Sequence, residues 1–320
     1  MGLIVEKIVS IFLIMAVGFV ANRTGVLPRE GNKFLTNLLI KIIAPCMIFS
    51  SITSKELTDD TFAATLYTLL GAALFSVCAA ALGWVLCKYL LRVSPLEDVG
   101  VYAFVFASLN SGFMGFPITL ALFGQDILYF MVVHNITLTL YLYTLGPIIL
   151  SMGSQGPQKK SAFDLRSVLA SLLNINTIVA FISIVMLFAG LHLPALLFEP
   201  IETIGNATVP ISMLLVGVQL GESNPLKIIK NGKLVAISVL KMLLLPVLTF
   251  LAVNWLPILP EVKLCMTFAA VFPGAVAAVP VVAIEGKNSL TCAEMVAFTT
   301  FLSVATVPLF AAFLMHWYGF

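Results

Sequence analysis

The chain contains very little charge. Only 10% of its 320 residues are Asp, Glu, Lys or Arg, whereas 60% are hydrophobic, and the mean hydropathy is +1.09. Soluble domains carry about 25% charged residues, so this chain has too few of them to cover a surface exposed to water. Long apolar runs occur along the whole sequence instead, which indicates a polytopic membrane protein. The basic residues are scattered and form no patch, so we expect no nucleic-acid partner.

Motifs of enzymes and metal sites are also missing. The sequence has no GxSxG, HExxH or Walker A motif and no GxGxxG pattern after a strand. Its three histidines fall on different apolar segments, and its five cysteines show no paired spacing. We therefore expect no enzymatic activity, no cofactor, no metal and no disulfide, and we interpret the cysteines as small buried residues.

Hydropathy predicts an all-α protein with ten membrane spans, each near the ~20 residues that a bilayer requires. The first repeat, residues 1–152, holds Leu3–Asn22, Phe34–Thr53, Thr61–Leu91, Val99–Phe123 and Ile127–Met152. The second repeat, residues 167–320, holds Val168–His192, Pro200–Leu220, Leu234–Leu256, Val262–Glu285 and Leu290–His316. Between the repeats lies a polar linker at residues 153–166.

Prolines recur at matching places in the two halves. The pairs keep nearly one register, with offsets of 165, 163 and 161 residues: Pro45 with Pro210, Pro117 with Pro280, and Pro147 with Pro308. Prolines are common in membrane helices, but three pairs in one register favour an internal repeat. Because each half has an odd number of spans, the second half must enter the membrane from the opposite face, which makes the repeat inverted.

Lysine and arginine are distributed unevenly between the two sides of the predicted spans. Twelve of the seventeen lie on the side of the central linker, and only Lys7, Lys55 and Lys263 lie on the other side. Cytoplasmic loops of membrane proteins carry an excess of basic residues. The sequence therefore predicts a cytoplasmic linker and two termini on the outer side of the membrane.

Two of the predicted spans contain residues that break helices. The fourth reads ASLNSGFMGFPITLAL at 107–122, and the ninth reads VFPGAVAAVPVVA at 271–283. Glycine and proline destabilise a helix, and in lipid the freed backbone groups persist only where protein, water or a ligand satisfies them. Interrupted spans at matching positions of two halves are typical of a transporter's binding site. The candidate substrate-binding residues are Asn110, Ser111, Gly112, Gly115, Pro117, Pro273, Gly274, Val279 and Pro280.

The chemistry of these breaks favours the binding of an anionic substrate. The half-helix after a break begins with unpaired N–H groups at the positive end of its dipole, and two such ends can meet near the membrane midplane. Asn110 adds a side-chain amide that both donates and accepts. A second interpretation stays open, in which Gly112, Gly115, Gly274 and Ala275 are small only so that helices pack closely.

Four polar residues inside other spans are candidates for ion coupling: Lys41, His134, Asn135 and Lys241. A lysine without compensation in hydrocarbon is unfavourable by about 3 kcal/mol or more, so each lysine needs a partner or water. Lys41 and Lys241 either act on the substrate or a proton, or extend toward the interface. His134 either carries a proton or packs between helices as a neutral, hydrogen-bonded side chain.

Four stretches resemble the auxin efflux carrier family, whose bacterial members include malonate and malate permease-type proteins. They are NLLIKIIAPCMIFSSI, LNSGFMGFPI, ATVPISMLLVGVQLGES and VFPGAVAAVPVVAIEG, in spans two, four, seven and nine. The resemblance covers essentially the whole chain. It implies a ten-helix inverted repeat similar to bile-acid symporters and sodium–proton antiporters, with a scaffold from spans 1, 2, 6 and 7. The other six spans would form a transport domain in which broken spans 4 and 9 cross, with Pro117 and Pro280 at the crossover and Asn110 beside the substrate. Plant carriers show Asn-Pro-Asn where this chain has Asn110-Ser111-Gly112, which puts auxin in doubt as the substrate.

We therefore expect a secondary transporter of small organic anions, carboxylates above all, that works by elevator-type alternating access in a bacterial inner membrane. Spans 4 and 9 contain no acidic residue except Glu285 at the end of the ninth, so we expect coupling to protons or to the membrane potential. One alternative is a sodium-coupled symporter of the bile-acid type with ligands around Asn110, Thr137 and Thr139. Another is a membrane sensor that binds without transport. The expected partners are the organic anion and membrane lipid, with a homodimer as a further candidate.

Overall fold

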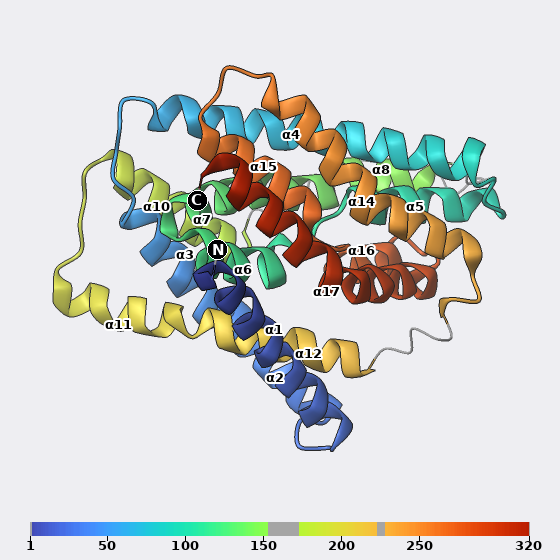
Figure 1. The fold of residues 1–320 in the computed structure, drawn as a ribbon, viewed down its shortest axis with the longest axis horizontal. Coiled ribbons are helices and arrows are strands. Elements are labelled where there is room, and N and C mark those ends of the chain that lie inside the picture. Colours follow the sequence, from blue (N-terminus) through green and yellow to red (C-terminus); the bar gives the residue numbers. More distant parts are fainter. Residues whose placement is uncertain (1, 153–172, 223–227, 320) are drawn as a thin grey trace.

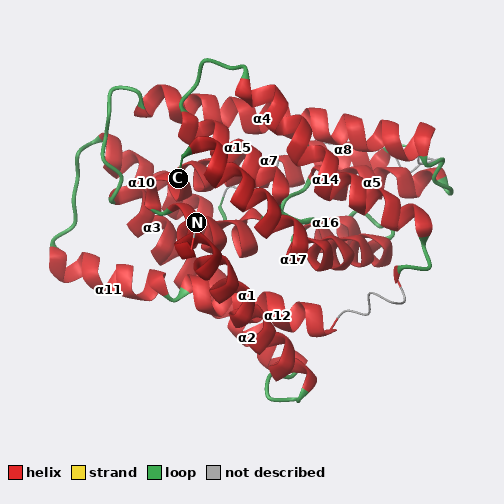
Figure 2. Ribbon diagram, viewed as in Figure 1, coloured by secondary structure: helices red, strands yellow, loops and turns green. Residues whose placement is uncertain are grey.

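The computed structural model describes residues 2–152, 173–222 and 228–319, and every regular element in these ranges is a helix (Figures 1 and 2). The linker 153–166, the beginning of the predicted sixth span and Lys227 lie outside the described residues. Within the described residues, seven helical stretches are long and apolar enough to cross a membrane, and shorter apolar helices lie at Val9–Arg23 and Ile175–Phe188. The all-α, multi-span character predicted from the sequence agrees with this architecture.

The helices follow one another in two series. The first half contains α1 (Gly2–Arg23), α2 (Arg29–Leu38), α3 (Ala44–Thr53), α4 (Thr61–Val85), α5 (Leu96–Ala107), α6 (Phe116–Phe123), α7 (Gln125–Tyr143) and α8 (Leu145–Ser151). Three π-helical turns interrupt it: η1 (Leu39–Ile43), η2 (Leu86–Leu90) and η3 (Ser111–Gly115). The second half contains α10 (Ile175–Phe188), α11 (Ala195–Asn206), α12 (Thr208–Glu222), α14 (Gly232–Asn254), α15 (Pro260–Val271), α16 (Ala278–Ile284) and α17 (Ser289–Tyr318).

Two of the π-helical turns have a local cause in the sequence. Turn η1 ends two residues before Pro45, and η3 ends two residues before Pro117. Proline donates no N–H and clashes with the carbonyl four residues earlier, and a widened turn relieves both problems. Proline therefore bends the chain here without ending the helical path.

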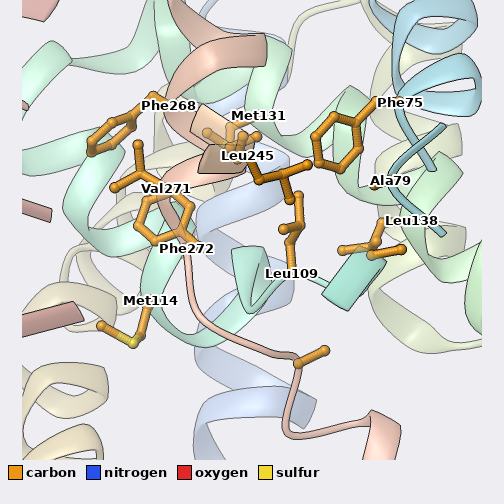
Figure 3. Packing of buried hydrophobic residues seen from close by; sticks show 14 of the residues in the cluster. Phe75, Ala79, Leu109, Met114, Met131, Leu138, Leu245, Phe268, Val271 and Phe272 are labelled. Carbon is orange, nitrogen blue, oxygen red and sulfur yellow. The ribbon is translucent and has the colours of Figure 1, made fainter. Parts of the chain in front are cut away.

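The helices pack in two groups, which also contact each other where α3 meets α7 and where α1 and α12 meet α17. In the first, α1 lies along α12, and α3 lies along α10 and α11. The contact between α1 and α12 is very close: Gly18 lies against the Leu214 carbonyl and Gly217 against the Met15 carbonyl, where any Cβ would collide with backbone. The second group joins α4, α5, α7 and α8 to α14, α15 and α17. A buried hydrophobic cluster fills its interior and continues into α1, α3, α10 and α12 of the first group (Figure 3).

Contacts at the helix ends join residues that the topology places on the same side. On the predicted outer side, Lys55 Nζ forms an ion pair with Asp126 at 2.7 Å. On the predicted cytoplasmic side, Lys233 Nζ donates to the Arg92 carbonyl at 2.7 Å. These contacts do not show which side is cytoplasmic, so the orientation stays a prediction.

The orientation can be tested by labelling a variant from which the native cysteines have been removed. We expect a cysteine placed within 158–161 to be protected from an impermeant maleimide in intact cells, and a cysteine appended after Phe320 to react. The reason is the excess of basic residues beside the linker. Permeabilised cells serve as the control, because the linker cysteine must then react. The reverse pattern would rule out the orientation. The same result at both positions would rule out the inverted repeat, because the linker and the C-terminus would then lie on one side.

Candidate functional site

The two broken spans contact each other at their breaks. Helix α5 ends at Ala107 and α15 ends at Val271, and after each of these helices the polypeptide continues as irregular backbone. There the Asn110 N–H donates to the Pro273 carbonyl at 2.8 Å. The Ala275 N–H donates to Ser108 Oγ at 3.3 Å. Each break thus provides a hydrogen-bond acceptor for a backbone N–H group of the other. Irregular backbone inside a membrane protein requires such partners. We call residues 108–111 and 272–275 the crossing.

Asn110 begins the half-helix that leaves the crossing. Its carbonyl accepts the N–H groups of Met114 and Gly115 at 3.2 and 3.1 Å, and the earlier N–H groups of a first turn have no partner within a helix. The Asn110 side chain is only 3% exposed, and its Nδ2 has no acceptor among the described residues. Buried polar groups are nearly always hydrogen-bonded, so an unpaired buried donor favours a ligand or water at this position.

The glycines of the breaks divide into two kinds. A Cβ at Gly112 would meet nothing within 4 Å. A Cβ at Gly115 would lie 3.2 Å from the Phe272 ring, and one at Gly274 would lie 2.7 Å from Val105. Close packing therefore accounts for Gly115 and Gly274, whereas Gly112 faces open space beside the first turn of the half-helix.

The remaining predicted substrate-binding residues do not all lie at the crossing. Ser111 Oγ donates to Asn135 Oδ1 at 2.6 Å, and the Gly274 N–H donates to Thr299 Oγ1 at 3.1 Å. Pro117 is buried, but Val279 is half-buried and Pro280 is exposed on α16. Ser111 and Gly274 thus belong to the crossing, and Val279 and Pro280 lie farther along the second half-helix.

Lys241 contacts the crossing from α14. Its side chain is fully buried, and its Nζ donates to the carbonyls of Phe106 and Ser108, each at 2.8 Å. These carbonyls lie at the end of α5, where the helix dipole is negative and the last C=O groups lack partners. The partner that a buried lysine requires is therefore a helix terminus, and not a carboxylate.

The other predicted ion-coupling residues are spread more widely. His134 is buried against Phe75, with ring centroids 6.1 Å apart, and neither ring nitrogen has a hydrogen-bond partner in the described part of the chain. The predicted packing is therefore present, and the predicted hydrogen bond has no protein partner among the described residues. Lys41 is exposed on η1. Thr137 and Thr139 donate to helix carbonyls at 3.4 and 2.9 Å.

Sequence reasoning missed two groups at the crossing. Ser108 supplies both a hydroxyl and a carbonyl, and Thr299 supplies the hydroxyl that receives the Gly274 N–H. Ser108 stands in the broken stretch and could have been singled out there, but nothing around Thr299 in the sequence marks it. No three His, Cys, Asp or Glu side chains gather into a metal site within the residues that the structure describes.

An all-helical chain with several membrane-crossing stretches, in which two interrupted helices meet at a buried polar crossing, has the architecture of a membrane transporter. The family model described as "Membrane transport protein" matches residues 3–311, and the chain therefore belongs to this family, which is of the auxin efflux carrier type.

Two relatives agree with this assignment. The chain is 24% identical over 220 residues to an uncharacterized transporter of Methanocaldococcus jannaschii, in an alignment that covers 67% of this chain and 68% of that protein. It is 23% identical over 146 residues to an uncharacterized transporter of Methanothermobacter thermautotrophicus, covering 45% of this chain and 46% of that protein. Both are transporters by description, and neither description gives a substrate.

Proposed function

We propose that this protein is a secondary transporter of small organic anions, carboxylates above all, and that the anion binds at the crossing. The observation that carries the proposal is the buried Asn110 amide, whose Nδ2 has no protein acceptor and which starts a half-helix beside the open space at Gly112. Amide donors at a helix N-terminus hold an anion with little desolvation cost.

The contact between the breaks supports a ten-span inverted repeat. Asn110 and Pro273, which share the 2.8 Å hydrogen bond, are 163 residues apart, the same offset that relates Pro117 to Pro280. A contact between equivalent positions is what a twofold axis in the membrane plane would produce. In this arrangement α15 and α16 together form the ninth span, and α1 and α10 form the first and sixth.

The two packing groups support a division into a scaffold and a moving transport domain. The group around α1, α3, α10 and α12 corresponds to the proposed scaffold of spans 1, 2, 6 and 7. The crossing is held mainly by the other group, through α5, α7, α14 and α17. An elevator-type movement would carry this second group past the first and expose the anion to each side in turn.

We further propose that transport does not require sodium. Residues 99–123 and 262–284 contain no Asp or Glu, so the crossing helices offer no carboxylate to a sodium ion. The ammonium of Lys241 lies against the same carbonyls that a cation would need. Transport would then be driven by a proton gradient or by the membrane potential.

Purified protein distinguishes this proposal from its alternatives. We expect one or more of acetate, malonate and malate to raise the unfolding temperature in a thermal-shift screen. We also expect the same compound to enter proteoliposomes at equal rates with sodium or potassium in the medium. Uptake that requires sodium would favour the bile-acid-type symporter, and binding without any uptake would favour the sensor.

A further inference from the structure

A long apolar cleft runs between α4 and α14. It has a volume of about 420 Å³. Tyr67, Leu74 and Cys78 line one wall, and Leu245 and Leu256 line the other, among sixteen lining residues in all. Thr249, which also lines the cleft, donates its hydroxyl to the Leu245 carbonyl, so it offers no free donor there.

The floor of the cleft is kept open by a glycine. A Cβ at Gly71 would lie 2.6 Å from the sulfur of Met266, which reaches the cleft from α15. Cys78 is exposed on the wall, so the expectation that all five cysteines are buried is wrong at this position. The wall residues Leu70 and Leu74 are 60% and 65% exposed, which shows that the cleft opens sideways.

Most of the lining belongs to two candidate membrane spans, Thr61–Leu90 and Gly232–Asn254, so we expect the cleft to lie in the hydrocarbon region of the membrane. The lining from Tyr67 to Leu82 corresponds to about 22 Å of helix, most of the ~30 Å hydrocarbon thickness. At one end stand Tyr67 and the highly exposed Trp255, residue types that prefer the membrane interface.

At its inner end the cleft approaches the candidate site. Phe75 lines the cleft and packs against His134. Leu245 lines it one helical turn after Lys241, on the same face of α14. Phe75 and Leu245 belong to the same buried cluster as Leu109, the residue that precedes Asn110 in the crossing (Figure 3).

We propose that this cleft binds one acyl chain of a membrane phospholipid, whose headgroup lies near Tyr67 and Trp255. The shape and surroundings favour this occupant. Apart from the Tyr67 hydroxyl at one end and the Cys78 thiol, the lining offers no free polar group, so it holds water or an organic anion poorly. A helix of a partner protein is 10–12 Å wide, far too wide for a cleft of this volume and length. The bound chain stabilises the contact between α4 and α14 that supports Phe75 and Leu245.

The binding can be tested with the full chain in vesicles of phosphatidylethanolamine and phosphatidylglycerol that contain a phosphatidylcholine with a photoreactive acyl chain. We expect cross-links to concentrate on residues that line the cleft in α4 and α14. Cys78→Phe should lose most of this cross-linking because the ring fills the cleft. Val77→Phe is the matched control, since Val77 is 50% exposed on the same helix but does not line the cleft.

A stability measurement gives a second, independent outcome. Added phospholipid should raise the unfolding temperature of the wild-type protein and of Val77→Phe in detergent, but not that of Cys78→Phe. Ala252→Phe, which enters from the opposite wall, repeats the test if Cys78→Phe does not fold. Cross-links spread evenly over all exposed helices would overturn the proposal, as would full cross-linking in Cys78→Phe or protection of the cleft by a second copy of the chain.

Discussion

Lys241→Met is expected to abolish carboxylate transport, whereas Lys241→Arg should retain a fraction of it. Methionine preserves most of the side-chain volume but removes the ammonium that donates to the carbonyls of Phe106 and Ser108. Each carbonyl left unpaired in a buried position destabilises the structure by about 1–3 kcal/mol. Because these carbonyls end α5 directly before Asn110, the crossing should lose its geometry, and transport should fall by more than about tenfold. Arginine keeps the positive charge and the N–H donors, but its planar guanidinium fits the two carbonyls less well than the ammonium does.

A second lysine of the same helix provides the control. Lys233 also donates to a backbone carbonyl, that of Arg92 at 2.7 Å, but it is exposed near the helix end. Lys233→Met should therefore transport at close to the wild-type rate. The flux of each variant is measured in proteoliposomes over a range of pH, after the unfolding temperature has shown that the protein is folded. Unchanged flux and pH dependence in Lys241→Met would exclude a role for this charge.

Asn110→Asp is expected to reduce transport by more than about tenfold while the protein still folds. The two side chains have nearly the same shape, so the substitution replaces only the unpaired Nδ2 donor with a second oxygen. If that donor faces a carboxylate, an ionised Asp side chain removes the hydrogen bond, because its oxygens can only accept, and it also repels the anion. The backbone bond from Asn110 to Pro273 does not depend on the side chain and should persist.

An Asn→Asp substitution at an exposed position is the control, because it shows whether the added charge alone reduces transport. Asn206→Asp, at the exposed end of α11, should leave uptake unchanged. The Michaelis constant of each variant shows where the loss arises, since a lost anion contact should raise it. Wild-type uptake in Asn110→Asp would mean that the unpaired amide contacts water and not the substrate.

The sequence was sufficient to locate the breaks, because their causes are local. Glycine and proline destabilise a helix wherever they occur, so Gly112, Pro117 and Pro273 mark the interrupted spans without knowledge of the fold. The sequence was not sufficient to separate Gly112 from Gly115. One faces open space and the other faces the Phe272 ring, and that difference depends on a residue more than 150 positions away.

The partners of the buried polar residues were also beyond the sequence. A lysine inside a span predicts a partner, but backbone carbonyls carry no sequence signal, so Phe106 and Ser108 could not be identified as the partners of Lys241. The surroundings of His134 could not be foreseen either, since neither ring nitrogen has a hydrogen-bond partner among the described residues. Both outcomes are set by packing between distant helices.

Counterflow in sodium-free proteoliposomes tests the central claim most directly. Vesicles loaded with a high concentration of the carboxylate found in the thermal-shift screen are diluted into a trace of the same compound carrying a radiolabel. An alternating-access transporter exchanges the two without any driving force, so the label should accumulate transiently in vesicles with wild-type protein and far less with Asn110→Asp. Binding of the carboxylate to wild-type protein, with no accumulation above empty vesicles, would contradict the account.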